Sequence, residues 1–254
     1  MSQEPGKPRF YLNSYAPLIA SPEGRSASEL LGIPPFVDGS IRREPDLEHR
    51  FPSISCLCRG RMFAPRLAVG DVVAYITVKR AERGRQRLTA LLRVKHLLNS
   101  HCDASDWYAS RRLPLPSNCM VHGNPPLPLE KSHRQNDHLR SGCGGGGLHR
   151  WDATYRARAV RWGRFVVCEP LFINLSWKAP VITNEHLNKA FGHVPPTRNP
   201  GALPLQGCRR LLRLLGLRDL PSALRISPSA ARSRRNTARP VPSGRRGARS
   251  ARRR

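Results

Sequence analysis

A strand, loop and strand unit in the first half of the chain constrains the fold more than any other feature. Residues 72–78 and 88–94 are rich in β-branched and aliphatic side chains, whereas residues 79–87 between them are nearly all charged or polar. A glycine and an aspartate, Gly70 and Asp71, give a turn signal directly before the first run. This pattern predicts a β-hairpin with a long solvated tip.

Further strands and a few short helices are expected around this hairpin. Alternating apolar and polar residues, or short apolar runs, predict more strands at 10–14, 53–58, 155–162 and 165–175. Capping residues and terminating glycines predict short helices at 27–31, 100–112 and 184–191. Strands with few and short helices are typical of an α+β fold, here a small curved β-barrel with short helices.

The composition divides the chain at about residue 200. Residues 201–254 carry 15 arginines and one acidic residue, a net charge of +14, and residues 1–200 carry the remaining +13. Residues 226–254 hold too few apolar side chains to offset chain entropy, so a disordered basic tail is expected after a short amphipathic helix at 207–217. Out-of-frame or read-through translation of GC-rich DNA yields the same composition. Residues 1–200 form one domain, in which the glycine-rich segment 132–150 is expected to be a flexible insertion.

The balance of charge favours a polyanionic partner. A formal net charge of +27 makes nucleic acid the first candidate, because neutralising phosphates releases counterions. The first ten residues lack the apolar core of a signal peptide, and the run 165–175 is too short and too interrupted to span a bilayer. Seven cysteines, an odd number without an export signal, favour reduced thiols. A cytoplasmic protein with no membrane partner is therefore expected.

Several segments, taken in order, resemble a known group of folds. The Gly70-Asp71 turn and its hairpin are followed by Trp107-Tyr108, by a proline-rich loop and by a late aromatic strand that ends at Trp177. This order is similar to the PUA-like group, which includes the EVE and ASCH domains, and within it to the nucleotide-modification-associated (Nmad) families of bacteria and phages. The resemblance covers about residues 8–198. The matching segments are 51–58, 65–73, 88–94, 107–108, 113–121 and 165–180.

Resemblance to this group implies a curved PUA-like barrel whose open side receives a flipped or modified base. An aromatic wall would stack the base, amide groups would read its edge, and basic side chains would hold the flanking phosphates. The residues that take these roles are Tyr75 and Trp177 for stacking, Asn118 and Asn124 for the base edge, and Arg59, Arg61 and Arg66 for phosphate. Each has a structural alternative, because Tyr75 could be a core residue, Asn118 could cap a turn, and the arginines could form a solvated rim.

Two functions follow from the resemblance. The first is a non-catalytic module that binds nucleic acid, DNA rather than RNA, beside DNA modification or restriction enzymes, with no cofactor. The second is an enzyme that modifies a nucleotide or base with the loop around Asn118 and Cys119, where His122 lies three residues further on. A zinc site is a weaker alternative, since only Cys119 and His122 have the usual ligand spacing. Neither catalytic nor metal-binding residues are assigned.

Overall fold

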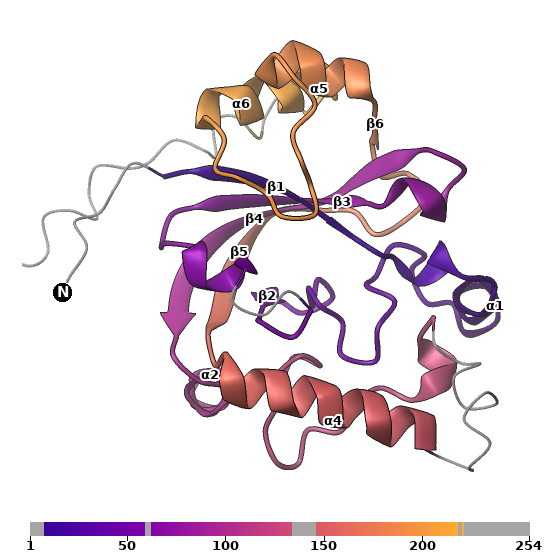
Figure 1. Ribbon diagram of the computed structural model, residues 1–254, viewed down its shortest axis with the longest axis vertical. Helices are drawn as coiled ribbons and strands as arrows, with labels where there is room; N and C mark the ends of the chain where they lie inside the picture. Colours follow the sequence, from indigo (N-terminus) through magenta and orange to yellow (C-terminus); the bar gives the residue numbers. More distant parts are fainter. Residues whose placement is uncertain (1–7, 59–61, 134–145, 218–219, 221–254) are drawn as a thin grey trace, which may run out of the picture. The chain divides into compact units, whose positions relative to one another are not determined.

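A curled sheet of six strands forms the centre of the described chain (Figure 1). The computed structural model describes residues 8–58, 62–133, 146–217 and 220, all within the first of two units, Met1–Ala223. The strand order is β1-β3-β4-β5-β2, and β6 pairs with one end of β4. The strands are β1 (Phe10–Tyr15), β2 (Ser53–Ile54), β3 (Val72–Thr77), β4 (Gln86–Leu98), β5 (Phe165–Ile173) and β6 (Val181–Ile182).

The predicted hairpin is confirmed, because β3 and β4 pair as antiparallel neighbours. Strand β1 pairs with β3 in the parallel direction, and β4 pairs with β5 in the antiparallel direction. Register shifts interrupt both antiparallel pairings, between Tyr75 and Ile76 and at two places along β4. Such bulges bend and twist strands, so the sheet curls into a half-barrel. The α+β class is confirmed; in the described residues no pairing joins β1 to β2.

The described helices are short, apart from one, and local signals fix their ends. The side chains of Ser21, Ser100 and Thr183 each accept a backbone hydrogen bond at a helix start. Gly32 and Gly192, at φ of 63° and 80°, end two of the helices in the left-handed region. Helices α5 and α6 lie on one side of the sheet, and α2 and α4 lie on the other (Figure 1). The helices are α1 (Pro22–Leu31), α2 (His101–Ala109), α4 (Gly146–Arg161), α5 (Asn184–Phe191) and α6 (Leu205–Leu214).

Strand β1 is buried on both of its faces. Phe10 stacks on Phe191 of α5, with ring centroids 5.8 Å apart. Tyr11 and Tyr15 belong to the main core cluster together with Tyr75 of β3. Because successive strand side chains point to opposite faces, β1 separates the α5 side of the sheet from the side that carries α4.

The strand predicted at 155–162 is wrong, because residues 155–161 belong to α4. Tyr155 and Ala159, four residues apart, bury one face of this helix against Ile41 and Leu57. An alternating pattern over only eight residues also places apolar side chains at the spacing i, i+4, so periodicity alone could not separate helix from strand. Residues 146–150, which were expected to belong to a flexible insertion, form the first part of α4. Residues 134–145 of that insertion lie outside the described residues.

The folded unit continues past the boundary expected at residue 200. Leu203 exchanges two backbone hydrogen bonds with Phe10, at 3.1 and 2.8 Å. Helix α6, which the sequence indicated at 207–217, then buries Cys208, Leu211 and Leu212. The basic tail lies outside the described residues beyond position 220. None of the helices in the described segments is long and apolar enough to cross a membrane.

Candidate functional site

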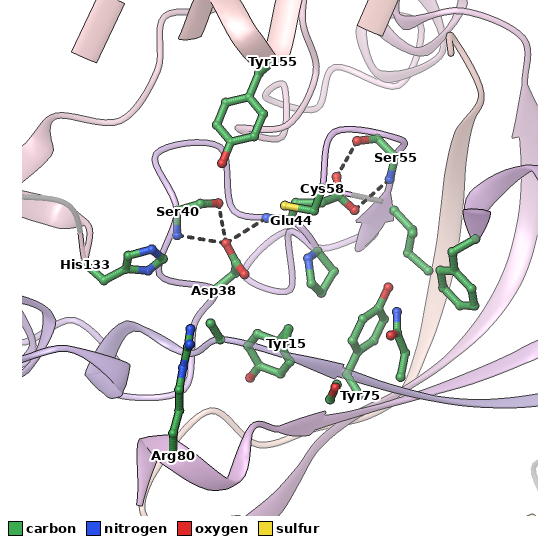
Figure 2. A pocket seen from close by; sticks show the side chains of 16 residues that line it. Tyr15, Asp38, Ser40, Glu44, Ser55, Cys58, Tyr75, Arg80, His133 and Tyr155 are labelled. Carbon is green, nitrogen blue, oxygen red and sulfur yellow. Dashed lines mark hydrogen bonds between the residues drawn. The ribbon is translucent and has the colours of Figure 1, made fainter. Parts of the chain in front are cut away.

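A cavity of about 210 Å³ lies between the sheet and α4 (Figure 2). Strand β1 contributes residues 13–15 to its wall, and β3 contributes Tyr75. The opposite wall comes from the irregular chain between α1 and β2, and Tyr155 reaches it from α4. Arg80 of the 3-10 turn η4 (Lys79–Ala81) also lines the cavity. The site therefore draws on segments more than 140 residues apart in the sequence.

Asp38 is the central acid of this cavity. One of its oxygens, Oδ1, accepts hydrogen bonds from the backbone N–H of Ser40 at 2.9 Å, from the backbone N–H of Glu44 at 3.0 Å, and from the Ser40 hydroxyl. Figure 2 shows these three bonds on one oxygen and none on the other. Burial raises the pKa of Asp38 to about 6, although the hydrogen bonds from Ser40 oppose that rise.

Glu44 is the second acid, and its carboxylate is fully engaged. Its Oε1 accepts from the Ser55 backbone N–H at 2.9 Å, while its Oε2 accepts from the Ser55 hydroxyl and, at 3.1 Å, from Asn118 Nδ2. Burial raises the pKa of Glu44 to about 7. Glu44 therefore holds the cavity wall together and adds negative potential beside Asp38.

Other polar side chains converge on the same space. The hydroxyls of Tyr75 and Tyr155 point into the cavity from the sheet and from α4, and Arg80 and His133 approach Asp38 (Figure 2). Asn13 is only 3% exposed, and its Oδ1 has no hydrogen-bond partner in the part of the chain that the structure describes. The wall thus combines acceptors, hydroxyls and one exposed cation around a small volume.

A glycine makes room for His133 at the edge of the cavity. The His133 backbone N–H donates to the Gly39 carbonyl at 2.8 Å. A Cβ atom on Gly39 would lie 2.0 Å from His133 Nδ1, which is far inside contact distance. Residue 39 must therefore lack a side chain for the imidazole to occupy this position.

The cavity wall that carries Asp38 and Glu44 is called the acidic wall, and a buried ion pair fixes it to α4. The Arg42 side chain is fully buried, and its Nε donates to Asp152 Oδ1 at 2.7 Å. Its Nη2 lies 2.6 Å from the same oxygen, without the angle of a hydrogen bond. The remaining nitrogen, Nη1, donates to the carbonyls of Ser117 and Asn124 at 3.1 and 3.0 Å. Arg42 thereby connects the cavity wall, the proline-rich loop and α4.

Of the residues expected to contact a base, Tyr75 lines this cavity, whereas Asn118 and Asn124 lie outside it. Tyr75 lines the cavity and is also a buried core residue, at 2% exposure. Asn118 is completely buried, and its amide is used by Glu44 and by the Ser53 hydroxyl, which donates to Oδ1 at 2.7 Å. Asn124 donates to the carbonyls of Pro116 and Cys119. The two asparagines therefore support the wall and the proline-rich loop.

The other expected site residues lie elsewhere. Trp177 is 57% exposed, packs edge-on against Phe36 at 5.1 Å, and lines a separate groove that Arg25 and Arg85 also line. Arg66 is exposed on a different part of the surface, and its carbonyl accepts a hydrogen bond from the Arg9 side chain. Arg59 and Arg61 lie outside the described residues.

The loop around Cys119 does not have the chemistry of an activated nucleophile. The Cys119 thiol is buried, donates to the His101 carbonyl at 3.4 Å, and has a pKa raised by burial to about 12. A thiolate is the reactive form, so this environment suppresses reactivity. Burial also lowers the pKa of His101 to about 4, and its Nδ1 accepts from the Met120 backbone N–H. Within the described ranges, no three His, Cys, Asp or Glu side chains gather as metal ligands.

Sequence reasoning missed the acidic wall, although a signal for it exists. Residues 38–46 contain three acids and two arginines, together with glycine and proline, in a stretch without helical or strand periodicity. Charges of both signs in such a loop are typical of a solvated turn, yet every residue from 36 to 47 is buried.

Comparison of the chain with protein-family models, with curated proteins and with solved structures finds no match.

Proposed function

We propose that this protein binds DNA and accepts one base, displaced from the helical stack, in the cavity between the sheet and α4. The observation that carries the proposal is the wall itself, where the Asp38 carboxylate and the hydroxyls of Tyr75 and Tyr155 face one small volume (Figure 2). A displaced base needs hydrogen-bond partners for its edge and ring or apolar surfaces for its faces. A PUA-like fold, whose open side receives the base, is part of the proposal.

The size of the cavity suits a single base. Its volume of about 210 Å³ is roughly seven times the share of one water molecule in the liquid, about 30 Å³. Pockets for drug-sized ligands start at about 300 Å³. A small planar ring system therefore fits, while the sugar and phosphates of the nucleotide would remain outside.

The tip of the hairpin supplies the charge that the phosphates require. Lys79, Arg80, Arg83 and Arg85 are all exposed on this tip, and Arg80 also lines the cavity. Two acids and Arg80 line the cavity, and the other three cations lie on the same hairpin tip, so the base would meet acceptors inside while its anionic backbone would meet positive charge outside. We therefore move the proposed phosphate contacts from Arg66 to the hairpin tip.

A binding role is favoured over catalysis at the proline-rich loop. The buried thiol of Cys119, with its raised pKa, provides no nucleophile, and Asn118 is fully used by the wall. A module that recognises a modified or flipped base would work beside enzymes of DNA modification or restriction. The basic tail would add affinity that does not depend on sequence.

The proposal is tested with the full-length chain and labelled duplexes that differ only in one unpaired, bulged base. The bulged duplex should bind about tenfold more tightly or better, at each point of a salt series. That ratio should persist as salt rises, because both duplexes make the same phosphate contacts, including those of the tail. Equal affinities for bulged and paired duplexes would refute the proposal.

Cys58 offers a way to close the cavity without a core mutation. It is exposed and lines the cavity, so a bulky maleimide on its thiol should remove the preference for the bulged duplex. The matched control is Cys58→Ser, which leaves the other cysteines to react under the same treatment. If treated wild type and treated C58S keep the same preference, the base does not enter this cavity.

A further inference from the structure

We infer that the base accepted by this cavity is one that carries an exocyclic amino group, as cytosine and adenine do, because two hydrogen-bond acceptors of the wall, Asp38 Oδ2 and Asn13 Oδ1, have no partner among the described residues. The inference rests on the proposed function and specifies its ligand. It follows from two atoms on opposite walls, one on Asp38 and one on Asn13.

The first acceptor is the second oxygen of Asp38. Three protein donors occupy Oδ1, whereas Oδ2 has no hydrogen-bond partner among the described residues. The residue is only 5% exposed, so little solvent reaches that oxygen except through the cavity. A carboxylate oxygen held in this way accepts a hydrogen bond from an N–H group, and acidic side chains pair with the N4 amino group of cytosine for this reason.

The second acceptor lies across the cavity on β1. Asn13 pairs with Tyr75 in the sheet register, so both side chains rise from the same level of neighbouring strands. Its Oδ1 is buried without a partner in the described chain, a state that costs about 1–3 kcal/mol. A ligand donor would remove that cost. The amide thus gives an independent indication that a hydrogen-bond donor occupies the cavity.

The neighbouring acid, Glu44, does not compete with Asp38 for a ligand donor. Both carboxylate oxygens of Glu44 already accept hydrogen bonds from Ser55 or Asn118. Glu44 therefore contributes negative potential to the cavity and no hydrogen bond to a ligand. A keto oxygen placed against Asp38 would set two acceptors face to face. A site built around hydrogen bonds rejects the analogue that cannot make them far more strongly than an apolar pocket does.

The experiment compares bases that differ by one amino group. Labelled duplexes carry a bulged cytosine or uracil in one pair, and a bulged adenine or hypoxanthine in the other. The amino member of each pair should bind roughly 5- to 150-fold more tightly, which corresponds to about 1–3 kcal/mol per base contact. Equal affinities within each pair, with bulged duplexes still preferred over paired ones, would overturn this inference and leave the proposed function standing. Loss of the preference for bulged duplexes would refute both.

Two variants locate the discrimination. Asp38→Asn keeps an oxygen for the Ser40 and Glu44 donors and turns the cavity-facing atom into a donor, so it should reverse the preference toward uracil and hypoxanthine. Asp106→Asn removes the same charge from an exposed position on α2 and should leave the preference unchanged. If D38N fails to fold, Asn13→Leu serves instead and should bring the amino-to-keto ratio toward one. An unaltered ratio in a folded D38N or N13L variant would contradict the assignment.

Discussion

Removal of the Asp152 carboxylate tests how the acidic wall is held to α4. Asp152→Ala would leave the Arg42 guanidinium, which is completely buried, without the oxygen that its Nε and Nη2 approach at 2.7 and 2.6 Å. Breaking a buried ion pair in this way costs about 3–5 kcal/mol, because an uncompensated charge remains inside the protein. The total stability of a domain is about 5–15 kcal/mol, so the loss should be large.

The assay is urea denaturation of the full chain, followed by circular dichroism. At a slope of about 2 kcal/mol per M, the D152A midpoint should fall by roughly 2 M. The control is Glu185→Ala on α5, which removes an equally short ion pair, 2.6 Å from Lys189, from an exposed surface. Exposed pairs contribute little, so E185A should leave the midpoint unchanged.

A second substitution separates lost charge from lost packing. Adding Arg42→Met to D152A should recover part of the stability, because the buried charge disappears with its partner. The reasoning is refuted if D152A unfolds within 1 kcal/mol of wild type. It is also refuted if D152A loses no more stability than E185A.

Three other outcomes are expected. Gly24→Ala should destabilise the chain strongly, because the added Cβ would lie 1.7 Å from a backbone carbonyl oxygen of the preceding turn, whereas Gly201→Ala meets nothing within 4 Å and should be neutral; thermal melting compares the two. Burial raises the pKa of Glu44 from 4.5 to about 7, so the free energy of unfolding should fall as pH rises through that window, and urea titrations of Glu44→Gln should lose the slope between about pH 6 and 7, above the pKa of Asp38, which is raised to about 6. Alkylation read by peptide mass mapping should label exposed Cys102 in the native protein and buried Cys119 only after unfolding, and labelling of both at equal rates would contradict the assigned burial.

The sequence predicted the sheet better than it predicted the site, because the strands and helices have local signals and the site residues do not. The hairpin of β3 and β4 has local signals, namely two runs of β-branched and aliphatic residues and a polar tip, so its pairing could be predicted without knowledge of the rest. Helix α5 has a capping threonine at its start and Gly192 at its end, and its predicted bounds are confirmed. Such signals lie within a few residues of the element that they define.

The acidic wall has no local signal of that kind. Arg42 is buried because Asp152, 110 residues away, and two carbonyls of the proline-rich loop receive its donors. Before those contacts are known, the same residues read as a solvated loop. Asn118 shows the converse, since its amide was expected to meet a base and instead meets Glu44 and Ser53. Burial of polar side chains depends on tertiary partners that periodicity does not reveal.

The position of β1 also sets an order of events during synthesis. Its outer edge is closed late, by hydrogen bonds from Phe10 to Leu203 and from Ser14 to Thr197, the latter 183 residues away. At about 5–20 residues per second, the ribosome needs on the order of 10–40 seconds to supply these partners. During that interval the nascent strand would present open backbone groups, which are a template for pairing with other chains. The chain therefore depends on residues 197–203, near the end of the described chain, to protect its first strand.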